Sequence, residues 1–497
     1  MLSKIKTKWL VIISFCIYVI SLIPVVYMGF FNYATGDDYY YGAPVKHAIE
    51  NGDSFLQIIR VAWNDVIREY YGFQGTLATM FVWRFEPSIW GEKAYTITIF
   101  ISLGILNLGI FYLLHVIIVR LLELDRSTYL VAGSMTMFFV VQYMVYPRSG
   151  LYFFPGVIRY SLAFGFVCLA MGLAVMYLKS GGKKRLVGII FLLTYLGGSG
   201  FPSIVMSGLG ISFLIICGLL SKEDEKKRRA LILIIPAILE LIGFTIAATS
   251  PGNAVRGGED FGFSLGRVLQ VFYRCFTNGT IGIFKYFTYA RPLVLLPIGL
   301  FILAYISNTT VKIRVKDIII VGIIGWFIVC MTRSPEYYAG NTVMGGFSGG
   351  VYDSYYYISM IYIVTMSLML GMLAGTGKKN EAVVRNAIGA FVAFMLLFVD
   401  IINKYLLKNM LDYTIYDYII TGQAQDFEEQ MQQRLQLLST DEMDVVVPDI
   451  NDQQGPFMHM PVTKDAGSYT NAVTADLYNK RTIVAIPRDE WEEKYGQ

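Results

Sequence analysis

Long apolar runs are the feature that most constrains what this chain can fold into. They recur from Trp9 to Asn403, and many approach or exceed the roughly 18 residues that a helix needs to cross the hydrocarbon core of a bilayer. Short charged loops separate the runs. The mean hydropathy is +0.52 and 16% of the residues are charged, against roughly 25% in an ordinary soluble domain. The pattern predicts one all-α membrane domain over residues 1–403.

Positively charged short loops set the orientation of such a domain, because basic residues are retained on the cytoplasmic face. We expect the basic clusters to be cytoplasmic, at residues 4–8, 120–126, 183–185, 226–229, 312–316 and 378–385. Alternation between them predicts single spans at about residues 9–31, 94–119, 127–146, 157–178, 230–249, 287–307, 317–332, 353–375 and 384–403. The first span has no small-residue cleavage site behind it, so we expect it to stay as a signal anchor.

The stretch at residues 186–220 decides the number of spans. Basic residues flank it on both sides, so it must cross the membrane an even number of times although it is short. Gly197, Gly198, Gly200 and Pro202 interrupt it near the middle. We therefore expect two short spans joined near the outer leaflet. The total becomes about eleven transmembrane helices, with a cytoplasmic N terminus and an extracytoplasmic C terminus.

The outer segments too long to be simple turns are residues 32–93, 250–291 and 404–497. The first contains apolar and aromatic pieces such as residues 77–85, which predicts helices that lie on or dip into the membrane surface, and residues 263–286 have the same character. The last begins with a helical pattern and continues with strand-like runs at 445–447 and 482–486. We expect it to form a small extracytoplasmic α+β cap, as a second domain.

Asp37 and Asp38 are the sharpest chemical feature, because the two adjacent carboxylates come within a few residues of the first span. Their repulsion raises the pKa of one of them, and at a membrane surface such a pair can act as a general base or hold a divalent cation such as Mg²⁺ or Mn²⁺. The solvated start of a loop is the alternative interpretation. The 3 histidines are widely separated and show no zinc pattern, and no nucleic-acid-binding motif is present.

The chain resembles the GT-C superfamily of lipid-linked glycosyltransferases. The resemblance covers the architecture of nearly the whole chain: an acidic pair that opens a long first outer loop, surface helices, many spans and an outer C-terminal cap. The chain is closer still to a bacterial family of multi-pass proteins with an early Asp-Asp-Tyr, here starting at Asp37. That family also has a later Pro-Gly-Asn followed by Arg, here starting at Pro251 and followed by Arg256.

The resemblance implies transfer of a sugar from a polyprenyl-phosphate donor to an envelope glycan or lipid acceptor. Transfer would occur on the outer face of a bacterial plasma membrane, with inversion at the anomeric carbon. Asp37 is the expected base for the acceptor hydroxyl, Asp38 a supporting group, and both are candidate metal ligands. Adjacent aspartates depart from the acidic-x-acidic form of several members, which leaves metal dependence open. The ring of Tyr39 either stacks on sugar or belongs to the aromatic belt of a membrane protein.

The donor phosphate becomes the leaving group, so the site needs fixed positive charge near the outer leaflet. The candidate outer-face arginines are Arg148, Arg159, Arg256 and Arg333. Each has an alternative role, because arginine at the end of a span often extends to lipid phosphates. Arg256 is the strongest candidate, since the preceding Pro-Gly-Asn, which ends at Asn253, favours a tight turn whose amides would join the guanidinium in an anion nest.

Glu240 lies inside the predicted span at 230–249, where a charge is costly and either functional or paired with an arginine for structure. It supports a rival class, a transporter or flippase for a lipid-linked or charged solute, with Glu240 and the broken stretch at 186–220 as the path. A non-catalytic envelope assembly protein is a third alternative. A transferase predicts that Asp37 matters more than Glu240, and a transporter predicts the reverse.

Overall fold

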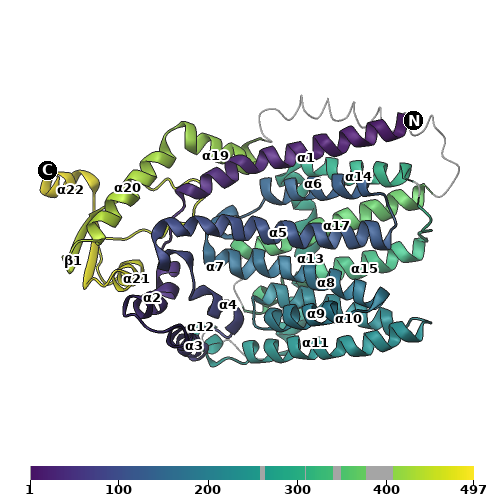
Figure 1. Cartoon of the computed structure of the whole chain (residues 1–497), viewed down its shortest axis with the longest axis horizontal. Helices are drawn as coiled ribbons and strands as arrows, with labels where there is room; N and C mark the ends of the chain where they lie inside the picture. Colours follow the sequence, from purple (N-terminus) through teal and green to yellow (C-terminus); the bar gives the residue numbers. More distant parts are fainter. Residues whose placement is uncertain (1, 258–263, 308, 340–348, 376–406, 497) are drawn as a thin grey trace.

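The computed structural model describes residues 2–257, 264–307, 309–339, 349–375 and 407–496. Most of the long helices run side by side in one bundle, with the N terminus at one end and the C terminus beyond the other (Figure 1).

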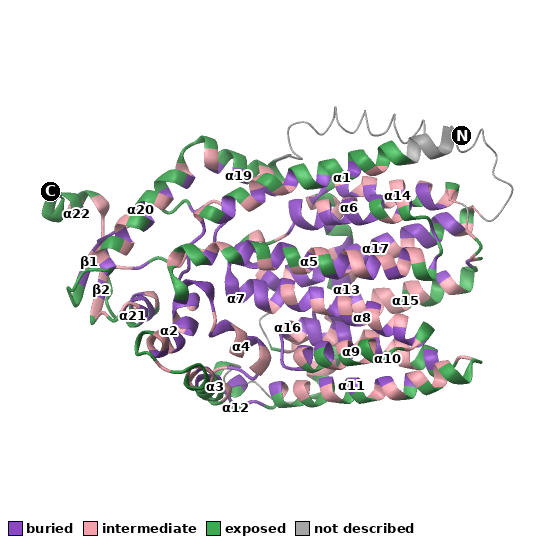
Figure 2. Cartoon of the chain, in the orientation of Figure 1, coloured by how far each residue is buried: buried purple, intermediate pink, exposed green. Residues whose placement is uncertain are grey.

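Six helical segments among the described residues are long and apolar enough to cross a membrane, and a bent helix pair is a seventh candidate. The six contain α1 (Leu2–Met28), α5 (Ile97–His115), α8 (Ala163–Ser180), α10 (Phe201–Leu219), α11 (Asp224–Ala248) and α17 (Gly349–Ala374). The bent pair joins α13 (Leu265–Tyr289) to α14 (Leu295–Ile306) through a bend of 108°. α17 is the most buried of the six, whereas α1 and α11 lie at opposite edges and bury few of their residues (Figure 2).

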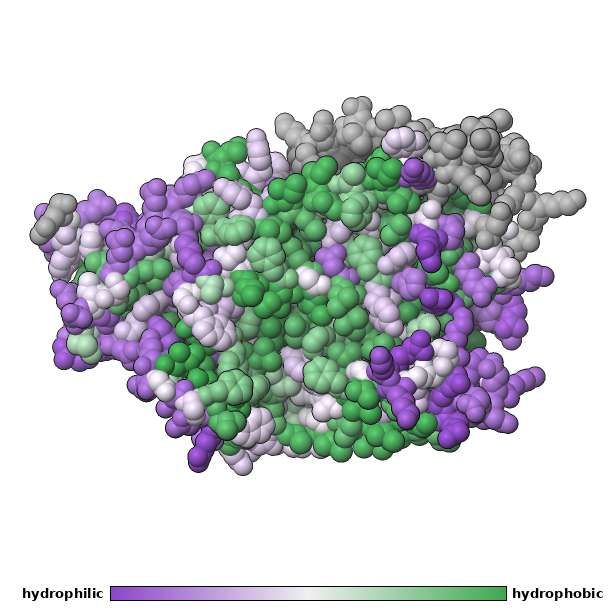
Figure 3. All heavy atoms as spheres, in the orientation of Figure 1, coloured by the Kyte–Doolittle hydropathy of each residue, from purple (hydrophilic) through white to green (hydrophobic). Residues whose placement is uncertain are grey.

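Hydrophobic side chains cover the middle of the visible face, and hydrophilic side chains gather at both ends (Figure 3). A helical bundle in a bilayer requires this distribution, because helices satisfy their own backbone hydrogen bonds while apolar side chains contact lipid. Length, apolarity and distribution together define an all-α membrane protein with several passes.

Further apolar helices of the bundle are shorter. They are α6 (Arg126–Gln142), α9 (Lys183–Gly197) and α15 (Val315–Met331). The junction of α9 and α10 lies beside α4, where Ala78 N donates to Gly198 O (2.9 Å). Gly181, just before α9, lies near Arg229, and Gly218, near the end of α10, lies near Ala230, so both far ends lie beside the start of α11. The two helices therefore run in opposite directions. The broken stretch at 186–220 therefore forms two antiparallel helices. The predicted span at 384–403 lies outside the described residues.

Several basic loops meet at the end of the bundle where α1 begins. Lys179 Nζ donates to Arg120 O (2.7 Å), and Arg229 Nη1 donates to Lys179 O (3.1 Å). Thr309 Oγ1 donates to Leu122 O (2.9 Å), which brings the loop after α14 to the same place. Three of the basic clusters thus share one end, and the side of the membrane that this end faces stays a prediction.

Short elements cover the opposite end (Figure 1). The first loop and the segment after α11 form α2 (Asp37–Glu50), α3 (Phe55–Gly72), α4 (Leu77–Trp83) and α12 (Pro251–Gly257). The tail forms α19 (Leu411–Ile420), α20 (Gln423–Leu438), β1 (Asp444–Pro448), α21 (Tyr469–Leu477), β2 (Thr482–Ile486) and α22 (Arg488–Tyr495). β1 and β2 pair in parallel, with Val445 opposite Ile483. The remaining helical turns are η1 (Gly29–Phe31), η2 (Pro87–Trp90), η3 (Glu92–Thr96), η4 (Val116–Leu121), η5 (Arg148–Tyr152), α7 (Phe154–Gly156), η6 (Val157–Leu162), η7 (Arg291–Val294), α16 (Ser334–Tyr338) and η8 (Leu407–Asn409).

Residues 77–85, which were expected to lie on or dip into the membrane surface, pack into the end of the bundle as α4 and the residues after it, and their depth in the membrane stays a prediction. Met80 and Trp83 are buried, and Arg84 directly after the helix is 0% exposed. The Arg84 guanidinium forms an ion pair with Asp65 of α3 (2.7 Å) and lies over the ring of Tyr41 (4.9 Å). Pairing with a buried carboxylate offsets the cost of removing the arginine from water, so this piece packs inside the end of the bundle.

Candidate functional site

Asp37 begins α2 and faces the tail. The preceding Gly36 has φ 43°, and a Cβ there would collide with Met460, so the turn into α2 requires glycine. Asp37 is half-buried, and its Oδ1 accepts a hydrogen bond from the Tyr469 hydroxyl of α21 (2.8 Å). Burial raises the pKa of Asp37, while the Tyr469 hydrogen bond and the charge of Arg256 lower it.

Asp38 has different surroundings and no exposed surface. Its Oδ2 accepts from Thr35 N (3.0 Å), and its Oδ1 has no hydrogen-bond partner within the described part of the chain. Burial, followed by the charge of Glu86, raises the pKa of Asp38 well above its ordinary value. Glu86 is also buried, accepts from Ser88 N (2.8 Å), and has its pKa raised to about 8 by burial. Burial therefore favours the protonated form of both Asp38 and Glu86.

Arg159 and Arg256 converge on one amide oxygen. Arg159 Nη1 (3.1 Å) and Arg256 Nη1 (3.0 Å) both donate to Gln74 Oε1. Glu336 of α16 is half-buried, and burial raises its pKa while the charges of Arg159 and Arg256 lower it. Glu336 therefore lies within the electrostatic range of both arginines. The charge of Arg256 also acts on Asp37. Hydrogen bonds therefore gather two predicted phosphate ligands around Gln74, and charge interactions link the predicted base Asp37 and Glu336 to them. We call these residues the Asp37 cluster: Asp37, Gln74, Arg159, Arg256 and Glu336.

Gly252 and Asn253 determine where Arg256 lies. A Cβ on Gly252 would meet Phe73 N at 2.5 Å, so only glycine lets the start of α12 approach the backbone beside Gln74. Asn253 Nδ2 donates to Ala247 O (2.7 Å) at the end of α11. The expected tight turn is the first turn of a helix, since Pro251 to Gly257 are helical, and the anion nest stays a prediction. Asn253 therefore supports the position of Arg256 by capping α11.

Arg148 and Arg333 have other partners. Arg148 is exposed, donates to Gly455 O in the tail (3.0 Å), and lines a separate cavity. Arg333 is buried, donates to Asn278 O (3.2 Å), and lies over the ring of Tyr355 (4.9 Å). Of the four predicted phosphate ligands, these two are not among the residues gathered around Gln74.

Glu240 lies inside α11 and is 2% exposed. Its Oε1 accepts from the Ser207 hydroxyl of α10. Its Oε2 has no partner among the residues that the structure describes. The partner of Oε1 is a serine and not the arginine of the structural alternative, so one carboxyl oxygen is satisfied within the described structure.

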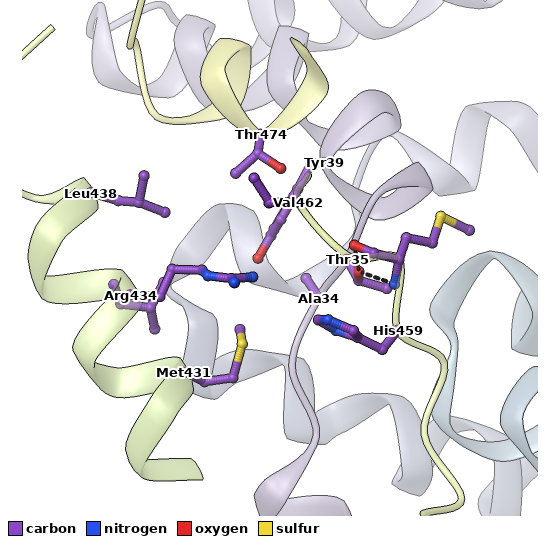
Figure 4. Close-up of a pocket in the computed structure, with 11 residues that line it drawn as sticks. Ala34, Thr35, Tyr39, Met431, Arg434, Leu438, His459, Val462 and Thr474 are labelled. Carbon is purple, nitrogen blue, oxygen red and sulfur yellow. Dashed lines mark hydrogen bonds between the residues drawn. The ribbon is translucent and has the colours of Figure 1, made fainter. Parts of the chain in front are cut away.

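Tyr39 is buried beneath the tail and does not offer a free ring face to a ligand. Its ring meets Tyr478 of α21 edge-on at 5.9 Å. It lines a small pocket of about 10 Å³ with Arg434 and His459, into which the Arg434 side chain extends from α20 (Figure 4). That volume admits about one water molecule. Burial lowers the pKa of His459 to about 3, so this histidine stays neutral.

Four side chains of the site have no sequence signal of their own. Gln74, Glu336 and Tyr469 stand in no recognised motif, and Arg84 sits at the end of a hydrophobic piece. Only their contacts with Asp37, Arg159, Arg256 or Tyr41 identify them.

Over the described ranges, no group of three or more His, Cys, Asp or Glu side chains is arranged to hold a metal ion. Asp37 and Asp38 are bound to different partners, so a shared cation would need other ligands. The predicted Mg²⁺ or Mn²⁺ site stays a prediction.

The fold defines a class, a helical membrane protein with a polar cluster between its first loop and the segment after α11. No protein-family model matches the chain, and no curated protein matches it either.

Proposed function

We propose that this protein is a GT-C-like membrane glycosyltransferase, which moves a sugar from a polyprenyl-phosphate donor to an envelope glycan or lipid acceptor. One observation carries the proposal: Arg159 and Arg256 converge on Gln74, and the charge of Arg256 acts on Asp37. A carboxylate under the influence of a guanidinium pair supplies a base and an anion-binding pair, which sugar transfer from a phosphate donor needs.

The residues divide the chemistry between them. Asp37 takes the proton of the acceptor hydroxyl, and the acceptor oxygen forms a new bond to the anomeric carbon from the face opposite the phosphate. The bond between the anomeric carbon and the phosphate oxygen breaks, and its electron pair stays on the phosphate. Arg159 and Arg256 hold the charge that develops there, while Gln74 aligns the two guanidinium groups before the donor binds.

The proposed topology completes this function. It has about eleven spans, a cytoplasmic N terminus and an extracytoplasmic α+β tail in a plasma membrane, on the basis of the positive-inside rule. The basic loops around Arg120 and Lys179 share the end opposite the Asp37 cluster, which supports placing the cluster at the outer face.

Envelope glycan analysis of cells that lack the protein tests the proposal. Complementation with Asp37→Asn should restore the missing sugar at a rate about 100-fold or more below wild type, because the loss of a general base costs at least that factor. Asp53→Asn removes a carboxylate from the same loop outside the cluster and should restore the glycan fully. Full restoration by Asp37→Asn would remove Asp37 as the base, and an unchanged glycan in cells without the protein would end the transferase proposal.

A transporter or flippase is the second candidate, because Glu240 is a buried carboxyl group in a membrane helix with one oxygen unpartnered in the described structure. Glu240→Gln in the same complementation separates the two. A transferase keeps its product when Glu240 is replaced, whereas a transporter loses it and tolerates Asp37→Asn.

A further inference from the structure

A cavity of about 290 Å³ opens at the end of the bundle that carries the tail. Its walls come from four chain segments, at residues 144–148, at Tyr289, at 408–411 with Thr414, and at 455–456. Hydrogen bonds join these walls. Asn409 Nδ2 donates to Tyr289 O (2.8 Å), and Arg148 Nη2 donates to Gly455 O (3.0 Å). The cavity is thus enclosed by segments that hold one another in place.

The charged side chains of the cavity are all cationic. Arg148 and Lys408 line it and are both exposed, and none of its described lining residues is acidic. Arg148 uses Nη2 for Gly455, and its other donors have no hydrogen-bond partner within the described part of the chain. The Lys408 ammonium group has no hydrogen-bond or ion-pair partner among the described residues. Asp353, next to the wall, has no exposed surface, and its Oδ1 accepts from Tyr146 N (2.8 Å).

The remaining lining is amphiphilic. Its apolar members are Met144, Val145, Met410, Leu411 and Pro456. Tyr146 at the rim and Tyr413 on the neighbouring α19 are each 43% exposed. α19 packs against α1, whose outer face is apolar. Exposed tyrosines beside a lipid-facing helix mark the level of lipid headgroups.

We propose that this cavity binds the phosphate group of an anionic membrane lipid, with Arg148 and Lys408 as its ligands. Guanidinium and ammonium groups are the usual protein donors to phosphate oxygens, and basic pockets between membrane helices accept lipid headgroups. The apolar lining contacts the glycerol and the first methylene groups of the lipid. This site is separate from the Asp37 cluster, and it stands whether or not the protein transfers sugar.

Native mass spectrometry of the purified full-length protein, titrated with phosphatidylglycerol, tests the proposal. Arg148→Ala combined with Lys408→Ala should weaken binding of the first lipid by roughly 30-fold, because the variant lacks the attraction of two cations to the lipid phosphate. Arg60→Ala with Lys285→Ala removes two exposed cations elsewhere and should leave binding unchanged. The charge-conserving pair Arg148→Lys and Lys408→Arg should bind as wild type does, which separates lost charge from misfolding.

Two further arms identify the ligand. Diacylglycerol, which lacks the phosphate, should not occupy the site, and inorganic phosphate at the same concentration should not displace phosphatidylglycerol. Equal binding by the alanine pair and wild type would overturn the proposal, as would an equal loss in the control pair or equal binding of diacylglycerol. Displacement by inorganic phosphate would overturn the assignment to a lipid.

Discussion

At the residue scale, two adjacent aspartates have separate tasks because a helix begins at them. Asp38 turns inward, where its Oδ2 accepts from Thr35 N and fixes the chain that enters α2. Asp37 turns outward, toward Tyr469 and Arg256. Sequence alone left the two interchangeable. The burial of Asp38 and its raised pKa make Asp37 the group that stays accessible and more readily ionised.

Tyr469→Phe tests whether the tail tunes Asp37. Burial raises the pKa of Asp37 and the Tyr469 hydroxyl opposes that shift, so its loss raises the pKa further. In the proposed transfer reaction the base Asp37 works only when ionised, and we therefore expect the acidic limb of the transfer rate to move to higher pH, with less change above that limb. The measurement is the transfer rate against pH.

Asn479→Gly is the matched control for this prediction. It removes another bond between the tail and α2, to Glu50 Oε2 (3.0 Å), at a position whose φ of 54° glycine tolerates. The control should keep the wild-type profile. A Tyr469→Phe profile identical to wild type would show that the hydroxyl does not act on Asp37.

At the element scale, the approach of α12 to α3 carries Arg256 to Gln74. Gly252 allows this approach because it has no Cβ, and it packs directly against the backbone of Phe73. The Arg256 guanidinium then lies over the Phe73 ring (4.6 Å), which adds a cation–π contact to the hydrogen bond with Gln74. Gly252 and the cap that Asn253 places on α11 therefore set the position of the seven-residue helix α12.

Gly252→Ala should destabilise the protein by about 1 to 3 kcal/mol, as added atoms do in tightly packed sites. The new Cβ would meet Phe73 N at 2.5 Å and Gln74 N at 2.7 Å, and neither backbone atom can move away easily. Thermal unfolding followed by size-exclusion chromatography measures the effect. Gly208→Ala in α10 has nothing within 4 Å of its added Cβ and should not lower the melting temperature. Equal melting temperatures for both variants would contradict this packing.

The sequence predicted elements better than it predicted contacts. Apolar length located α1, α11 and α17, because lipid imposes a simple rule on each segment by itself. That rule says nothing of the contacts around α4, where the burial of Arg84 depends on a partner in another helix, Asp65. For the Asp37 cluster, charge alone proposed Arg159 and Arg256. Gln74 and Tyr469 became visible only through folding, since Tyr469 is far from Asp37 in sequence.

At the scale of the whole molecule, the first loop and the tail form one assembly at one end of the bundle. Lys46 Nζ donates to Leu477 O (3.1 Å), and His47 Nε2 lies 2.8 Å from Asp476 O. Met460 N donates to Thr35 Oγ1 (2.9 Å), two residues before Asp37. Because the first loop and the tail contact each other directly, they must lie on the same side of the membrane, although they come from opposite ends of the sequence.

Single cysteines test the orientation of this assembly. In a variant without the 5 natural cysteines, we expect Asp53→Cys and Glu493→Cys to react with a membrane-impermeant maleimide in intact cells. Lys184→Cys, among the basic loops at the other end, should react only after the membrane is permeabilised. Reaction at 184 but not at 53 would show that the topology is inverted. The Asp37 cluster would then lie on the cytoplasmic side, away from an outer-face acceptor. Reaction of 53 without 493 in intact cells would contradict the packing of the tail on α2 itself.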